Sequence, residues 1–199
     1  MDLQFFFHLF FIFIFLAFNF IRAFYQRKAT QTQGEVEYRD SHWLGIARKL
    51  IGIPFMLAFL AFFFRPSIFG WASFPLPVWA QWVGVALGLI SLPLIWWVQQ
   101  AIGSNFSTTL HVRAEHTLVQ HGPYRWVRHP MYTVQYINFT ALTLLTHNWL
   151  IAVFFLSFLT LIVINRLGKE EATMLEKFGD DYQAYMQRTG RFLPRFLAN

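Results

Sequence analysis

Residues 116–132, HTLVQHGPYRWVRHPMY, carry three histidines, two arginines and two tyrosines between apolar runs long enough to enter a membrane. Polar side chains in that setting are costly unless they bind one another or a ligand. A second polar group follows at Arg166, Glu170 and Glu171, where the four-residue spacing puts Arg166 and Glu170 on one helix face. An ion pair that ends the last apolar helix is the simpler explanation of that spacing. The two groups together are nevertheless the candidates for chemistry.

Several chemistries are excluded by what these residues lack. The chain has no cysteine, and so no thiolate ligand or cysteine nucleophile. The histidines at 111, 116, 121 and 129 do not have the spacing of a di-iron cluster, and HExxH is absent, so we expect no metal. P-loop, GxGxxG and GxSxG motifs are also absent. Metal-free binding of a polar cofactor by His, Arg, Tyr and backbone groups remains.

The rest of the chain is unusually apolar. Hydrophobic residues make up 56% and charged residues 13%, whereas a soluble domain carries roughly 25% charged residues. Lipid is therefore the expected solvent, and the formal charge of +6 is not clustered on a soluble face that would bind nucleic acid. The apolar runs predict an all-α, polytopic membrane helix bundle of about five transmembrane helices. These runs cover residues 3–24, 43–64, 78–98, 131–145 and 149–164.

The last two runs predict a helical hairpin. Each has 15 or 16 residues, or about 24 Å of helix against a hydrocarbon core of roughly 30 Å. Either the helices extend into the flanking polar residues or the hairpin crosses only part of the bilayer. Residues 25–42 and 65–77 are predicted loops, and Gly179 is expected to break the helical tail.

The third run has two features of a membrane helix. Gly84 and Gly88 form a G-x-x-x-G pair, which allows close helix packing. Tryptophans at both ends are typical of the aromatic belts at the two bilayer surfaces. These belts consist of Trp79 and Trp82 at one end and Trp96 and Trp97 at the other.

The basic residues predict the orientation. With five membrane helices, segments 22–49 and 99–130 and the tail from 165 share one side, and they hold 15 of the 16 lysines and arginines. Only Arg65 falls on the other side. Because cytoplasmic segments are enriched in Lys and Arg, we expect the catalytic loops and the C-terminus in the cytoplasm and the N-terminus outside.

We expect a single membrane domain over residues 1–199. Residues 1–98 would be a three-helix scaffold, and residues 99–199 the cofactor-binding and catalytic half. Residues 3–24 lack the basic leading region and the small-residue cleavage site of a signal peptide, so we expect a retained helix.

Several ordered motifs fill the second half of the chain. They are GSNFS (103–107), HTLVQHGPYRWVRHPMY (116–132), R-x-x-x-E-E (166–171), FGDDYQAY (178–185) and TGRFLP (189–194). In these motifs the chain resembles the isoprenylcysteine carboxyl methyltransferase family, integral-membrane enzymes that use S-adenosylmethionine without a Rossmann domain. The similarity covers about residues 100–196, whereas the first three helices match only in kind.

The resemblance implies a role for individual residues. Arg166 matches the arginine that meets the methyl acceptor, and Glu170 matches the tail glutamate that contacts the cofactor, so both are expected to be catalytic. Arg128 matches an RHP arginine, for which we expect a structural or carboxylate-binding role. The implied cofactor contacts are His111, His116, Thr117, Leu118, Val119, Tyr124, His129, Pro130, Met131, Tyr132, Glu170 and Glu171.

The chemistry of S-adenosylmethionine suits these residue types. Arg or His donors fit its carboxylate, Glu170 fits its ammonium, and Tyr or apolar side chains pack on the adenine and the sulfonium. Because the methyl group is already activated, catalysis is mostly alignment. An ionised carboxylate acceptor needs no base, whereas an amine acceptor must first lose a proton to a Glu or His.

The resemblance therefore implies a membrane methyltransferase for a lipophilic small-molecule or lipidated substrate that enters from the membrane lipid. The acceptor is expected to be the carboxylate of an isoprenylcysteine-like group. N-methylation of an amino-lipid of the phosphatidylethanolamine type is the alternative. A reductase-like membrane protein is a third possibility, because phospholipid methyltransferases and sterol reductases share parts of the H…G-x-Y…RHP…Y frame.

Overall fold

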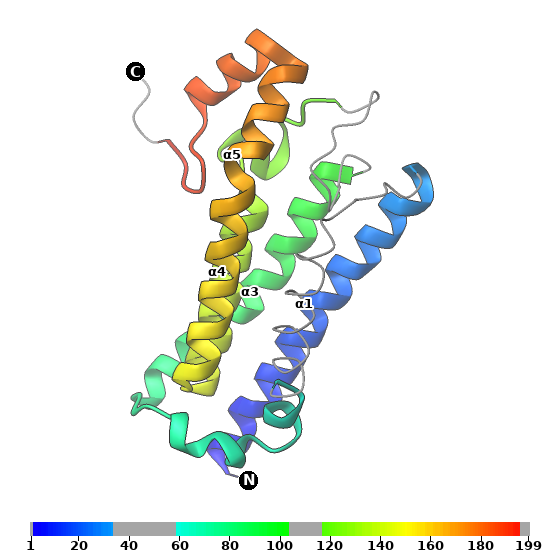
Figure 1. The fold of residues 1–199 in the computed structure, drawn as a ribbon. Coiled ribbons are helices and arrows are strands. Elements are labelled where there is room, and N and C mark those ends of the chain that lie inside the picture. The colour runs from blue at the N-terminus through cyan, green and yellow to red at the C-terminus, as the bar shows by residue number, and fades with distance from the viewer. Residues whose placement is uncertain (1, 34–58, 104–116, 196–199) are drawn as a thin grey trace, which may run out of the picture.

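The chain folds into a bundle of long helices (Figure 1). The computed structural model describes residues 2–33, 59–103 and 117–195. Within these ranges there is no strand beyond two isolated bridges, so the predicted all-α fold is confirmed. Three helices, α1, α3 and α5, are long and apolar enough to cross a membrane. The elements are α1 (Leu3–Gln33), a helical segment at 59–64, η1 (Pro66–Ala72), α3 (Val78–Ile102), η3 (Gly122–Arg125), α4 (Pro130–Thr146) and α5 (Trp149–Arg188).

Two helices are longer than their apolar runs. Helix α1 continues to Gln33, so the loop predicted from residue 25 is wrong over 25–33, a stretch without proline or glycine to stop the helix. Helix α5 continues through polar residues to Arg188, with the expected break at Gly179 (φ 50°). Extension into polar residues, one of the two alternatives for the hairpin, therefore holds for α5.

The turn between α4 and α5 is specified locally. Pro130 opens α4 at a position where the missing N–H costs nothing. His147 ends α4 in the left-handed conformation (φ 38°). Asn148 then caps α5, because its side-chain oxygen accepts from the backbone N–H groups of Leu150 and Ile151. This turn returns the chain along α4.

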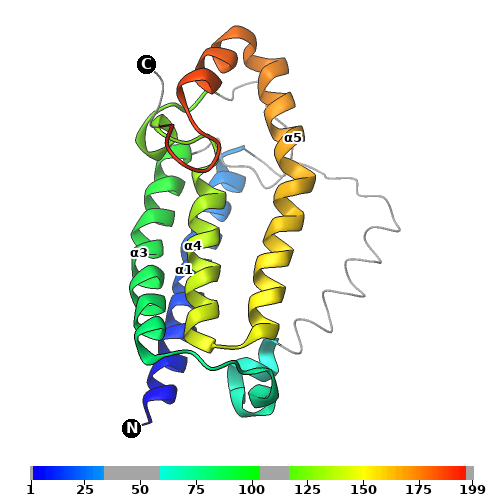
Figure 2. The same ribbon diagram turned by 90° about the vertical axis from the view of Figure 1, so that its left-hand side faces the viewer.

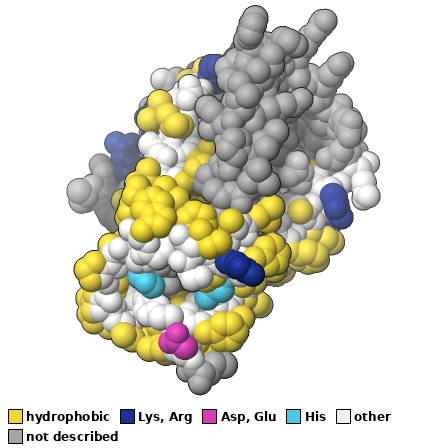
Figure 3. All heavy atoms as spheres, turned by 60° about the horizontal axis from the view of Figure 1, so that its bottom comes forward, with side chains coloured by type: hydrophobic (Ala, Val, Ile, Leu, Met, Phe, Trp, Pro, Cys, Tyr) yellow, Lys and Arg dark blue, Asp and Glu magenta, His cyan; other side chains and the backbone are white. Residues whose placement is uncertain are grey.

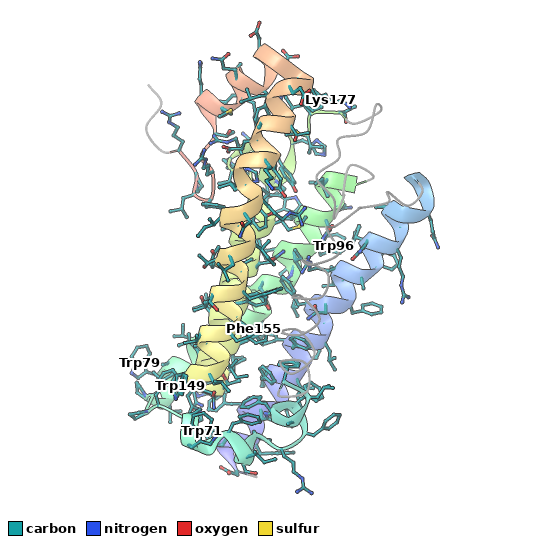
Figure 4. The ribbon with its side chains drawn as sticks, in the orientation of Figure 1. Trp71, Trp79, Trp96, Trp149, Phe155 and Lys177 are labelled. Atoms are coloured by element: carbon teal, nitrogen blue, oxygen red, sulfur yellow. The ribbon has the colours of Figure 1, made fainter. Side chains whose placement is uncertain are left out.

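The two ends of the bundle differ in character. The ends of α1 and α3, the start of α4 and the polar part of α5 lie together, and we call this the polar end (Figures 1 and 2). The N-terminus, η1 and the α4–α5 turn lie at the opposite end, where hydrophobic side chains are exposed with charged and histidine side chains among them (Figure 3). Trp71, Trp79 and Trp149 lie at that end and Trp96 lies towards the polar end (Figure 4). The orientation of these ends relative to the cytoplasm stays a prediction.

An aromatic cluster joins α5 to the rest of the bundle. The Phe155 ring of α5 stacks on Phe139 of α4 with 4.7 Å between centroids, and it also contacts Phe15 of α1 and Phe59 (Figure 4). Farther along α3 and α4, a buried polar pair adds a specific contact, because the Asn138 amide donates to the hydroxyl of Ser91 at 2.9 Å. These contacts hold α5 and α4 in place beneath the polar end.

Both glycines of the G-x-x-x-G pair lie at close helix contacts, as the motif predicted, although they contact two different helices. A Cβ at Gly84 would lie 2.9 Å from Leu144 Cβ and 3.1 Å from the Ala141 carbonyl oxygen of α4. A Cβ at Gly88 would lie 2.3 Å from the Ile14 side chain of α1. Because backbone cannot move aside as a side-chain tip can, Gly84 sets the distance between α3 and α4.

We expect Gly84→Val to destabilise the bundle by about 1–3 kcal/mol, because it overpacks this contact. The measurement is the thermal unfolding midpoint of the purified protein in detergent. Gly168→Val is the matched control, since a Cβ at that helical glycine meets nothing within 4 Å. Equal midpoints for the two variants would contradict the close approach of α3 to α4.

Candidate active site

The polar loop before α4 is held against the end of the chain. Val127 and Gly190 form a parallel bridge, and the N–H of Arg128 donates to the Gly190 carbonyl at 2.8 Å. Glycine is required at 190 because a Cβ there would lie 1.8 Å from the Leu193 carbonyl oxygen. Two motifs far apart in the sequence thus form one structural unit.

Arg128 fastens this unit to α5. Its Nε donates to Glu171 Oε1 at 3.1 Å, and its Nη1 donates to the carbonyls of Met186 (3.0 Å) and Thr189 (2.5 Å). These contacts combine the two expected roles of Arg128, structural and carboxylate-binding. The carboxylate that Arg128 binds is that of Glu171, and this contact joins two parts of the protein.

Glu171 is the centre of a buried ion cluster and is only 5% exposed. Arg191 binds it through two nitrogens, with Nε 3.2 Å from Oε1 and Nη2 2.7 Å from Oε2, and His129 Nε2 lies 3.4 Å from Oε1. Burial alone would raise the pKa of Glu171, but hydrogen bonds from His129, Arg191 and Arg128 lower that pKa to about 2. Glu171, which lies beyond the apolar part of α5, is therefore a permanent anion suited to fastening the loop and the tail.

Glu170 has a different environment from its neighbour, and its side chain is 25% exposed. Its Oε1 accepts from the Tyr132 hydroxyl at 2.9 Å and lies 3.3 Å from Arg166 Nε, while His129 Nδ1 lies 3.7 Å from Oε2. The Arg166 Nε is buried, yet it makes no hydrogen bond within the described parts of the chain. The ion pair expected from the spacing is therefore present but unsaturated, and both side chains retain the capacity to bind a ligand.

The remaining predicted cofactor contacts divide between this site and the core beneath it. Tyr124 is buried in a cluster with Val98 of α3 and Val134 of α4, and its carbonyl accepts from the Tyr185 hydroxyl at 2.6 Å. Val119 and Met131 pack against this cluster, Pro130 is buried, Leu118 is half-buried and Thr117 is exposed. His111 and His116 fall outside the ranges that the structure describes. Contact of each of these residues with a cofactor stays a prediction.

Three polar residues of this region were not among the predicted site residues. Arg191 belongs to the TGRFLP motif, but its partner Glu171 is known only from the fold. Gln99 of α3 is fully buried, and neither its amide nitrogen nor its amide oxygen has a hydrogen-bond partner among the described residues. Arg22 of α1 likewise has a buried, unpartnered Nε. An arginine near the end of an apolar helix is expected to extend its guanidinium group to water. The sequence therefore does not indicate that a nitrogen of Arg22 is buried.

The site combines a partly free carboxylate, unsaturated guanidinium groups and tyrosines at the polar end of the bundle. No group of three or more His, Asp or Glu side chains in the described ranges could hold a metal ion. The arrangement suits a polar ligand that carries both signs of charge. Together, the fold and these contacts define a class: a helical integral-membrane protein with a cluster of charged side chains at one end.

Comparison with known proteins finds similarity to one family. Residues 83–176 match the sequence model of the isoprenylcysteine carboxyl methyltransferase (ICMT) family. The fold matches the structure of the eukaryotic intramembrane Ras methyltransferase ICMT with a TM-score of 0.57, at 24% identity over 92% of this chain. Both comparisons relate this part of the chain and its fold to the ICMT family.

Coverage and sequence identity define the extent of these similarities. The chain spans 62% of the length of the solved ICMT chain, and at that sequence identity the likeness establishes the fold. The uncharacterized protein YpbQ of Bacillus subtilis (strain 168) is 23% identical over 145 residues, which are 72% of this chain and 80% of that protein.

Proposed function

We propose that the chain transfers a methyl group from S-adenosylmethionine to the carboxylate of a lipophilic, isoprenylcysteine-like acceptor. The observation that carries the proposal is the unsaturated pair Arg166–Glu170 at the polar end of a membrane bundle, within the residues that match the ICMT family. The eukaryotic protein of the same fold is named as a carboxyl methyltransferase.

The residues of the site fit this cofactor by their chemistry. S-adenosylmethionine, when bound, supplies a methyl group that its sulfonium charge has already activated. Glu170, together with the Tyr132 hydroxyl, offers an anionic and polar seat for the ammonium group. The unpaired amide of Gln99, next to the core cluster that contains Tyr124, offers a donor and an acceptor. Neither Glu170 with Tyr132 nor the amide of Gln99 would have to give up a complete set of hydrogen bonds in order to bind the cofactor.

The work of the chain is then to hold and orient. Arg166 holds the acceptor carboxylate, which is ionised at neutral pH and attacks without a base. His129 is fixed between Glu170 and Glu171, at 3.7 Å and 3.4 Å. The ion cluster around Glu171 thereby keeps α5, with Arg166 and Glu170, in register with the start of α4.

The position of His129 also favours a second candidate, N-methylation of an amino-lipid. A histidine beside a carboxylate is the group that would accept the proton that an amine acceptor must lose. The two candidates differ in the bond that forms, a methyl ester in one and an N-methyl amine in the other.

The test uses the purified protein in lipid nanodiscs with methyl-labelled S-adenosylmethionine and either N-acetyl-S-farnesylcysteine or phosphatidylethanolamine. We expect label in the farnesylcysteine and its release as methanol on treatment with base, because only an ester is base-labile. Base-stable label in the amino-lipid would establish the second candidate instead. If calorimetry detects binding of a nicotinamide cofactor and no binding of S-adenosylmethionine, both are wrong and a reductase-like protein is indicated.

A further inference from the structure

Arg22 has a buried guanidinium nitrogen without a described partner. It lies in helix α1, a candidate membrane span, and is partly buried, and its Nε makes no hydrogen bond within the described residues. No ion pair of Arg22 occurs within the part of the chain that the structure describes. An arginine whose whole guanidinium reached water would not bury this nitrogen.

The neighbours of Arg22 place it at the level of the proposed site. The preceding residue, Ile21, packs against the same core cluster as Met131 in the first turn of α4. Tyr132 follows Met131 and lies within the electrostatic influence of Arg22, Arg166 and Glu170. Arg22 of α1 therefore lies near the tyrosine whose hydroxyl donates to Glu170 of α5.

The described carboxylates of the site contact arginines other than Arg22. Glu171 contacts Arg128 and Arg191, and Glu170 is paired, incompletely, with Arg166. Arg22 pairs with neither carboxylate in the described residues. A partly buried guanidinium is tolerated in a membrane protein when an anion pairs with it. S-adenosylmethionine carries one carboxylate but an ammonium and a sulfonium as well, so it adds net positive charge, whereas a carboxylate acceptor adds an anion.

We propose that Arg22 is a second guanidinium for the acceptor carboxylate, which it holds together with Arg166 of α5. The inference rests on the proposed function and deepens it, because it assigns part of acceptor recognition to α1. That helix lies outside the residues 83–176 that match the family. Two arginines from different helices would select an anionic head over a neutral one and fix both carboxylate oxygens before the attack.

The test compares Arg22→Gln and Arg22→Lys with the wild type and with Arg27→Gln. Arg27 is an exposed arginine farther along α1, so its variant is a control with the same change of charge on the same helix. The acceptor is N-acetyl-S-farnesylcysteine, and its carboxamide serves as a neutral competitive inhibitor. Readouts are the KM for the acceptor, the KM for S-adenosylmethionine, the Ki of the carboxamide and the thermal unfolding midpoint.

For Arg22→Gln we expect the acceptor KM to rise about tenfold or more, because a charge-assisted hydrogen bond is lost. The Ki of the carboxamide and the KM for S-adenosylmethionine should stay within about twofold, so that the preference for the anion disappears. Arg22→Lys should recover part of the preference for the anionic acceptor. The unfolding midpoint should not fall, since the variant removes an unpaired buried charge.

The outcomes separate this inference from the function on which it rests. An unchanged acceptor KM in Arg22→Gln, a raised KM for S-adenosylmethionine in its place, or a lowered unfolding midpoint would each overturn the role of Arg22 while wild-type activity stands. A wild-type protein that does not methylate the farnesylcysteine carboxylate overturns the proposed function, and the inference with it.

Discussion

Glu170→Gln is expected to lower kcat/KM for methyl transfer about a hundredfold or more, without lowering the thermal unfolding midpoint. Glutamine preserves the shape of the side chain and can still accept from the Tyr132 hydroxyl, but it removes the charge that faces Arg166 and that we propose binds the ammonium group. A hydrogen bond to a charged group contributes about 1.5–3 kcal/mol, and a hundredfold loss corresponds to about 2.7 kcal/mol. Stability should be spared because Glu170 is partly exposed and its ion pair is unsaturated.

Arg166→Ala should be similarly inactive if Arg166 holds the acceptor, and the two losses should appear in different constants. Glu170→Gln should weaken binding of S-adenosylmethionine in calorimetry, whereas Arg166→Ala should leave that affinity within a few-fold of the wild type. Glu176→Gln, an exposed position on the same helix, is the control for loss of one carboxylate. Full activity of both Glu170→Gln and Arg166→Ala would show that the site is misassigned.

The sequence was informative wherever a local rule decides the structure. Apolar runs placed α1, α3, α4 and α5, whereas most of the run 43–64 lies outside the described residues. Gly179 marked the break in α5, and Gly84 and Gly88 marked close contacts between helices. The end of α1 was predicted too early, because a polar segment can still be helical. Residues 25–33 are polar but contain no helix-breaking residue.

The difference between Glu170 and Glu171 could not be predicted in the same way. Adjacent residues on a helix point about 100° apart, so one carboxylate faces the loop and tail while the other faces Tyr132 and Arg166. Which of them does so depends on where residues 126–129 and 189–191 lie against α5, and no local pattern encodes that placement. The burial of Arg22 Nε without a hydrogen-bond partner in the described residues is likewise not encoded by a local pattern.

Glu171→Gln should therefore lower the stability of the protein, whereas Glu170→Gln should lower its activity without lowering its stability. Replacing the shared carboxylate leaves Arg128 with a buried, uncompensated charge, and breaking a buried ion pair costs about 3–5 kcal/mol. The tail beyond Gly179 should detach from the loop at 126–129. We expect a lower unfolding midpoint in detergent and faster cleavage by trypsin in the tail, where Arg188, Arg191 and Arg195 are exposed.

The dependence on pH and on Arg191 distinguishes this ion cluster from an ordinary surface charge. Because the pKa of Glu171 falls from 4.5 to about 2 in the fold, its stabilisation is fully present above about pH 4.5 and is lost as the pH falls towards 2. The wild type should thus lose stability over that range, and Glu171→Gln should lose less. Adding Arg191→Gln to Glu171→Gln should lower the stability little further, because the ion pair between these two residues is already lost in Glu171→Gln alone. Fully additive losses would mean that Arg191 and Glu171 stabilise the fold separately, and the tail would then be held by its backbone bridge to Val127 rather than by the ion cluster.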